Sequence, residues 1–177
     1  MSLFEFNSQV PSVGKKSYIF DSADVIGNVT IGECCFIGPG ARIRGDYGKI
    51  VIGDKTSIED NCVIHARPNE ECRIGKYVTV GHGSVIHNAT IKDWAVIGMN
   101  AVVSDYSEIG EWSVVAEGCV VKNNQKIPSE KIAVGIPAKI VADTTKDYKK
   151  QWTHFKEIYA TLAEKTYREQ LKTIGIQ

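Results

Sequence analysis

Three of the four histidines in the chain fall within one short stretch, at a spacing that could form a metal site. His65 lies in the segment CVIHARP, and His82 and His87 lie close together in VGHGSVIHN. Imidazole is a common zinc ligand, and a catalytic zinc site usually has three protein ligands and one open position. Each histidine alone is typical of a surface residue, so the prediction depends on a fold that gathers the three rings.

Charged residues in and before this stretch could bind a small anionic substrate. Arg44 could position it through planar, charge-assisted hydrogen bonds, with Asp46 holding the guanidinium across a subunit boundary. The alternative for this pair is a surface salt bridge, which contributes only about 0–1 kcal/mol. Glu59 could orient an attacking water, or it could be an exposed corner acid. The fourth histidine, His154, falls in a predicted helical segment and is expected to be solvated.

A repeat of six residues determines where these side chains point. A branched aliphatic residue recurs at positions 19, 25, 31, 37, 43, 52, 58, 64, 74, 80, 86, 91, 97, 103, 109, 115 and 121. At most rungs, the residue two positions before is small or no larger than valine. This pattern is typical of a parallel β-helix, in which three short strands make one coil of 18 residues. Stacked coils should lie about 4.8 Å apart.

Two longer steps in the repeat indicate insertions, near Tyr47-Gly48 and at Pro68-Asn69-Glu70-Glu71. With these subtracted, Arg44, His65 and His87 fall in one outward column, and His82 falls on a different side of the coil. A third imidazole must then come from another subunit, and a threefold trimer satisfies that geometry. A shortened step after position 86 also predicts a bulge or a tightened corner beside His87.

Composition excludes several classes of function. The formal net charge is zero, which disfavours non-specific binding to nucleic acid or to an acidic membrane surface. No apolar run approaches the roughly 20 residues of a membrane span, and the first residues lack a signal peptide pattern. We therefore expect a cytoplasmic protein without nucleic-acid or membrane partners. Four cysteines occupy small interior positions of the repeat, where free cysteine behaves as a small hydrophobic residue: Cys35, Cys62, Cys72 and Cys119. Cys34 is expected to face outward.

The chain divides into three parts: a lead-in at 1–17, an all-β parallel β-helix domain with the metal site at 18–142, and a C-terminal α-helix at 143–177. Asp143 or Thr144 is the expected helix cap. The helix carries an apolar stripe made of Tyr148, Trp152, Phe155, Tyr159 and Leu162. This stripe should pack on the outside of one β-helix face; docking on a separate partner is the alternative. Glycines that follow the rungs should adopt positive φ at tight corners.

The run from Arg44-Gly45-Asp46 through EDNCVIH at 59–65 to VGHGSVIH at 80–87 resembles the γ-class carbonic anhydrases, a family of left-handed β-helix proteins. The resemblance covers about residues 15–142. It implies a homotrimer in which His65 and His87 of one chain and His82 of the adjacent chain bind Zn²⁺, or else Fe²⁺ or Co²⁺. It also implies Arg44 and Asp46 as residues that organise the site.

Two departures place the chain nearest the short-loop branch of that family, which includes accessory proteins of phenylacetate and carnitine operons. Glu59 stands where the family usually has Gln. The long acidic loop that carries a proton shuttle is absent, so Glu70 and Glu71 of the short insertion are the candidates for carrying a proton.

We therefore predict a metal-dependent, carbonic anhydrase-like lyase that interconverts CO2 and bicarbonate at a trimer interface. One alternative is an acyl-CoA-dependent acetyltransferase or thioesterase, because VGIPAK at 134–139 also looks like the closing segment of hexapeptide acyltransferases. Another is an inactive, metal-binding trimeric scaffold.

Overall fold

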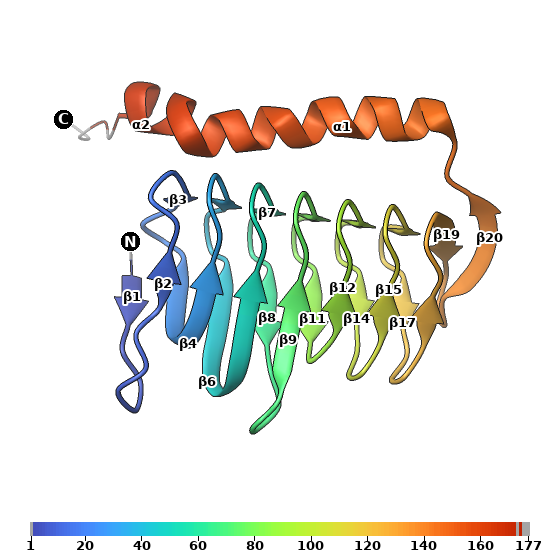
Figure 1. Ribbon diagram of the computed structural model, residues 1–177, viewed down its shortest axis with the longest axis horizontal. Helices are drawn as coiled ribbons and strands as arrows, with labels where there is room; N and C mark the ends of the chain where they lie inside the picture. Colours follow the sequence, from blue (N-terminus) through green and yellow to red (C-terminus); the bar gives the residue numbers. More distant parts are fainter. Residues whose placement is uncertain (1, 173, 175–177) are drawn as a thin grey trace.

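The protein is an all-β parallel solenoid with three faces and a C-terminal helix, consistent with a left-handed β-helix (Figure 1). The computed structural model describes residues 2–172 and 174. The face that carries His65 and His87, here the histidine face, holds the first halves of β4 (Asp24–Ile31) and β6 (Arg42–Ile52), with β1 (Ser2–Phe4), β8 (Val63–His65), β11 (Val85–His87), β14 (Val102–Val103) and β17 (Val120–Val121).

The other two faces follow the same parallel pattern. The second face holds the remaining halves of β4 and β6, with β2 (Ser12–Val13), β9 (Glu71–Ile74), β12 (Thr90–Ile91), β15 (Glu108–Ile109) and β18 (Lys126–Ile127). The third, here the helix face, holds β3 (Tyr18–Ile19), β5 (Phe36–Ile37), β7 (Ser57–Ile58), β10 (Thr79–Val80), β13 (Val96–Ile97), β16 (Val114–Val115) and β19 (Lys131–Val134), followed by the antiparallel β20 (Lys139–Asp143).

The six-residue repeat fills the interior as predicted. Rungs from neighbouring coils pair in register, as Ile43 does with Ile64 and Ile64 with Ile86, and all three side chains are fully buried. Coiling continues past position 121, because Ile127 and Ala133 are also in the core. Since the aliphatic side chains are removed from water along the whole axis, the core is one continuous column that orients every outward residue.

The glycines that follow the rungs mark close contact between coils. The expectation of positive φ at these positions is wrong, because the corner residues with positive φ are others, such as Cys34, Tyr77 and Trp94. At Gly53, an added Cβ would lie 2.6 Å from the carbonyl carbon of Gly75 in the next coil. A side chain there would push the coils apart, which is why glycine is required.

The two insertions lie against each other beside the histidine face. The first is no turn, because β6 runs unbroken from Arg42 to Ile52 and bends from one face to the next. The second forms the turn between β8 and β9. A Cβ on Gly48 would lie 2.2 Å from the carbonyl oxygen of Arg67, so the two insertions pack backbone against backbone. The shortened step is a tightened corner at Asn88, whose φ is 49°.

The C-terminal segment forms α1 (Lys146–Thr161), which continues through a π-helical turn (Leu162–Thr166) into α2 (Tyr167–Gln170). Thr145 is the N-cap, in place of the expected Asp143 or Thr144, and its hydroxyl accepts from the amide of Tyr148. The C-terminal part of the predicted helical segment at 173 and 175–177 lies outside the described residues. Figure 1 shows the helix lying along the prism over the helix face.

The face that α1 buries differs in part from the predicted stripe. Phe155 is exposed, and the position that enters the interface most deeply is Lys156, at 1% exposure. Its Nζ donates to the Thr79 hydroxyl and to the Ala95 carbonyl, both at 3.1 Å. Four cysteines are in the core as predicted, whereas Cys34 points out of the prism but is covered by the helix, where its thiol contacts Glu164.

Among the described residues, no helix has the length and apolar character needed to cross a membrane.

Candidate metal centre

The two histidines of the histidine face stack in one outward column with Arg44, as the repeat predicted. His65 pairs with Arg44 in β6 on one side and with His87 in β11 on the other. The Nδ1 atom of His65 lies 3.1 Å from Nε2 of His87. Two imidazole nitrogens that bind one tetrahedral zinc at 2.0–2.1 Å are about 3.3 Å apart, so the observed pair is close to the spacing a shared ion requires.

Each of these imidazoles has a carboxylate on its other nitrogen. Nε2 of His65 lies 2.9 Å from Oδ1 of Asp46, and Nδ1 of His87 makes a short contact with Oδ1 of Asp105. Because a carboxylate accepts but does not donate, these contacts hold the proton on the outer nitrogen and leave the inner lone pairs facing each other. Carboxylate–histidine pairs of this kind are typical of metal-binding histidines.

Arg44 and Asp46 form an ion pair within one chain. Nη1 of Arg44 lies 2.5 Å from Oδ2 of Asp46, which differs from the expected contact across a subunit boundary. Burial alone would raise the pKa of the Asp46 carboxyl, but hydrogen bonds from His65 and Arg44 outweigh it and hold that pKa below its ordinary value. The Arg44 side chain is 47% exposed, so its remaining N–H groups are open to a ligand beside the histidines.

His82 lies at a corner of the helix face, apart from the histidine column. Its Nδ1 accepts from the amide of Asp60 at 3.3 Å, and its Nε2 lies 3.0 Å from Oε2 of Glu59. Within one chain, the described residues contain no group of three or more His, Cys, Asp or Glu side chains arranged to hold a metal ion. The set His65, His82 and His87 can therefore meet at one ion only through contact between two copies.

Glu59 is buried beneath His82, contrary to an exposed corner acid. Its exposure is 6%, and burial raises the pKa of its carboxyl, while His82 and a hydrogen bond with Tyr159 of α1 act in the opposite direction. The carboxylate thus joins the corner to the C-terminal helix. Lys156, also on α1, lies nearby; burial lowers the pKa of its amine to about 7, and its interaction with Glu59 partly offsets that effect.

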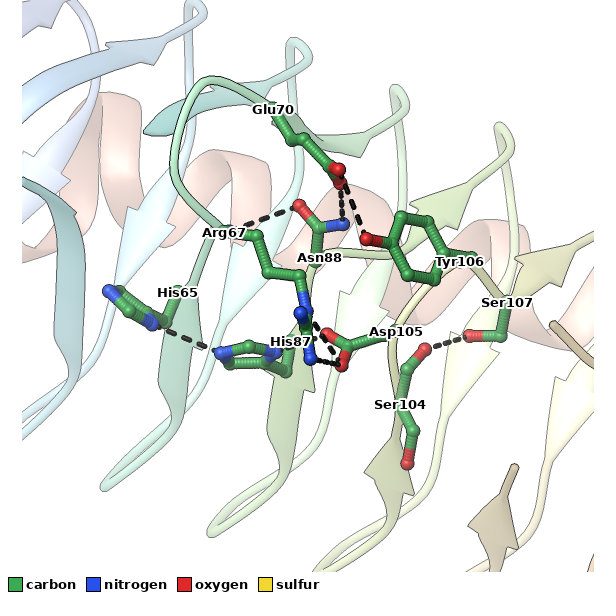
Figure 2. A network of polar contacts seen from close by, with 9 residues as sticks. All are labelled: His65, Arg67, Glu70, His87, Asn88, Ser104, Asp105, Tyr106 and Ser107. Atoms are coloured by element: carbon green, nitrogen blue, oxygen red, sulfur yellow. Dashed lines mark hydrogen bonds and ion pairs between the residues drawn. The ribbon is translucent and has the colours of Figure 1, made fainter. Parts of the chain in front are cut away.

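The two acids of the second insertion point to different places. Glu70 is held beside the next corner, where Asn88 Nδ2 donates to one oxygen and the Tyr106 hydroxyl lies 3.0 Å from the other (Figure 2). Glu71 faces the second face and pairs with Lys49 at 3.1 Å and with Arg73 at 2.6 Å. Of the two, Glu70 lies in the network drawn with the histidines.

The sequence prediction missed Asp105 and Arg67. Ile86 pairs with Val103, so the coil after His87 is one residue short and Asp105 falls one position beyond the histidine column, where the repeat alone did not point to it. Arg67, directly before the second insertion, reaches Asp105 with Nε at 3.0 Å and Nη2 at 2.9 Å from Oδ2. Figure 2 shows these two side chains beside His87, with Asn88 and Glu70 above them.

A parallel prism built on six-residue rungs defines a hexapeptide-repeat protein, and comparison with known proteins agrees. Residues 11–45 match the family model described as bacterial transferase hexapeptide (six repeats). The carnitine operon protein CaiE of Proteus sp. (strain LE138) is 36% identical over 86% of this chain and 77% of its own length. The chain therefore belongs to the hexapeptide-repeat family that includes CaiE.

Solved structures resemble the whole chain. A Bacillus cereus protein, provisionally described as an acetyltransferase, superposes with a TM-score of 0.92 at 29% identity, covering 96% of this chain and 98% of that one. A hexapeptide transferase family protein from Anaplasma phagocytophilum gives a TM-score of 0.89 at 32% identity, with the same coverage of 96% and 98%. The similarity extends over the prism and the C-terminal helix alike.

Proposed function

We propose that the protein is a metal-dependent enzyme that interconverts CO2 and bicarbonate at a site shared by two copies of the chain. The observation that carries the proposal is the pair of facing nitrogens on His65 and His87, 3.1 Å apart, each ring backed by a carboxylate. These two side chains and His82 of a second copy would hold Zn²⁺, or Fe²⁺ or Co²⁺. When bound, such an ion supplies a Lewis acid that generates a nucleophile from water near neutral pH.

The chain's own residues have distinct parts in this proposal. Arg44 presents its free N–H groups beside His65 and can hold the oxygens of bicarbonate by charge-assisted hydrogen bonds. Asp46 fixes both Arg44 and His65, so it couples the anion-binding group to the histidine pair. Glu70 is the candidate for passing a proton to solvent, because Glu71 is neutralised by two cations on another face.

An outward column of valines favours a second copy as the neighbour of the histidine face. Val63, Val85, Val102 and Val120 pair in register on adjacent strands, and Val63 is 41% exposed. The column runs beside the histidines, two residues before His65 in β8. An apolar stripe next to an incomplete site suits burial against another chain. A closed threefold ring would supply one such contact at each of three interfaces.

Transfer or hydrolysis of an acyl-CoA thioester is the second candidate, and the descriptions of the relatives favour it. In that reaction, His87 oriented by Asp105 would act as the general base through Nε2. The position of His65 argues against a free base, because its Nδ1 occupies the space in front of that nitrogen at 3.1 Å. Two imidazoles so placed are better suited to sharing a cation.

The decisive experiment is CO2 hydration by the zinc-loaded protein, followed with a pH indicator in a stopped-flow instrument from pH 7 to 9. We expect a rate above that of buffer, lost in His87→Ala and kept in the matched control His154→Ala, which removes the exposed histidine of α1. A metal-loaded protein with no hydration across this range would remove the proposal. Consumption of acetyl-CoA that survives a chelator would favour acyl transfer in its place.

Glu59→Gln separates an enzyme from an inactive relative. If the variant loses an activity that the wild type has, Glu59 belongs to a working site. If hydration starts only in the variant, the wild-type chain is better described as a metal-binding scaffold, because the buried carboxylate then suppresses the reaction.

A further inference from the structure

We propose that Asp105 is a positioning residue of this site: it holds the His87 ring with Nε2 turned toward His65 and thereby strengthens the binding of a divalent cation by the two rings. The inference rests on the proposed metal centre and not on the reaction it performs. Asp105 lies on the coil after His87, beyond the three-histidine set, and its residue exposure is only 7%.

The first argument is that the two carboxylate oxygens of Asp105 have different partners. Oδ1 contacts Nδ1 of His87, whereas Oδ2 receives both Nε and Nη2 of Arg67, at 3.0 and 2.9 Å. The guanidinium therefore fixes the plane of the carboxylate and leaves the other oxygen for the imidazole. Figure 2 shows the Asp105 carboxylate beside the Arg67 guanidinium and the His87 ring.

The second argument is the tautomer that this contact selects. A carboxylate can only accept, so the proton of a neutral His87 stays on Nδ1 and the lone pair stays on Nε2. Nε2 is the nitrogen that faces His65. Without the carboxylate, the ring could carry its proton on either nitrogen and could rotate, and both changes would remove a ligand lone pair from the site.

The third argument is a contrast with other corner aspartates of the prism. Asp54 accepts the amide of Glu33 at 3.0 Å while its other oxygen pairs with Lys76 at 2.9 Å, and Asp93 accepts the amide of Lys76 at 2.8 Å, so each satisfies a backbone amide of the preceding coil. Asp105 occupies a comparable place in its coil, but its two oxygens contact side chains of His87 and Arg67. Asp105 therefore orients the histidine side chain, in contrast to the aspartates that satisfy backbone amides.

Arg67 also contacts the corner that follows His87. Its backbone amide donates to Asn88 Oδ1 at 3.1 Å, and its guanidinium lies over the Tyr106 ring at 5.8 Å. These contacts tie the insertion to the corner that follows His87. Arg67, the residue directly before the second insertion, thus supplies the cation that anchors Asp105.

The test is cation affinity, measured with the full-length wild type, Asp105→Asn, Arg67→Met and the control Asp93→Asn. Each protein is titrated with Zn²⁺ in competition with a coloured chelator, and the visible spectrum of the Co²⁺ form is recorded. Loss of a carboxylate behind a ligating histidine typically weakens metal binding about 10–100-fold, so we expect that loss in Asp105→Asn together with an altered Co²⁺ spectrum. Arg67→Met should change both in the same direction by less.

Asp93→Asn should keep the wild-type affinity and spectrum even where its thermal stability falls. Wild-type affinity in Asp105→Asn, an equal loss in Asp93→Asn, or a wild-type protein that takes up no divalent cation would overturn the inference. If Asp105→Asn does not fold, Arg67→Met decides, because it leaves Asp105 in place and removes its anchor. If the wild type and variants show these relative Zn²⁺ affinities but the wild type hydrates no CO2, the proposed function is removed and the role of Asp105 stands.

Discussion

Replacing Lys156 by Met should change how the stability of the protein depends on pH. Burial disfavours the ammonium and lowers the pKa of Lys156 from 10.5 to about 7, an effect that Glu59 only partly opposes. Between these values the unfolded chain binds a proton that the folded protein does not, so wild-type stability should rise with pH across this window. A pKa difference of this size corresponds to about 5 kcal/mol, which is the penalty carried below pH 7 and relieved by pH 10.5.

The Met variant lacks the titrating amine and should lack that rise. It also leaves the Thr79 hydroxyl and the Ala95 carbonyl without their partner, at a cost of about 1–3 kcal/mol each that does not depend on this titration. The slope is therefore the measured quantity: relative to Lys156→Met, the wild type should gain about 1.4 kcal/mol per pH unit between pH 7 and 10.

Urea unfolding from pH 6.5 to 10 measures this slope, provided that protein concentration and metal content are held fixed, since assembly and ligands shift apparent stability. Lys150→Met is the matched control, because Lys150 lies on the same helix and is exposed. Parallel profiles for the wild type and Lys156→Met would refute the reasoning and would mean that the buried amine keeps its proton in the fold.

Two further substitutions test the assembly and the prism. Val85→Asp places a charge in the outward valine column and should shift the mass in solution, measured by light scattering, from that of the proposed trimer to that of a single chain. A variant that keeps the trimer mass would exclude the histidine face from the interface. Trp94→Ala removes the stacking of the Trp94 ring on two neighbours, Tyr77 and Trp112, whose ring centroids lie 4.0 Å and 4.8 Å away. It should lower the free energy of unfolding by about 1–3 kcal/mol at fixed protein concentration, and an unchanged unfolding midpoint would contradict this.

The sequence was sufficient to predict the prism, because the six-residue period both identifies the fold and fixes which residues point inward and which point outward. Once Ile43, Ile64 and Ile86 point inward, the residues that follow them must point outward. The alignment of Arg44 with His65, and of His65 with His87, was therefore predictable after subtracting two insertions, as the strand register confirms. Local spacing needed no knowledge of how the chain packs elsewhere.

Contacts made by the C-terminal helix could not be predicted in this way. The pattern of aromatic residues located the helix but not its rotation or its position along the prism, and Lys156 was not among the residues of the predicted stripe. Its burial, and that of Glu59 beneath Tyr159, depends on which strand of the helix face each turn of α1 covers. Such a choice is made by side-chain packing across more than 70 residues of sequence, as the contact of Lys156 with Thr79 shows.

In the proposed metal centre, the geometry of the histidines would link cation binding to assembly. Nδ1 of His65 and Nε2 of His87 lie 3.1 Å apart within one chain, so two of the three proposed ligands are already adjacent before a second copy joins them. His82 has its Nε2 on Glu59 and can reach a cation on another copy only by exchanging that partner. Each copy thus contributes a prepared pair and a third ring that is engaged elsewhere. In the proposed site, a cation would contact all three rings only where two copies meet, and its binding would then favour the assembled state over the single chain.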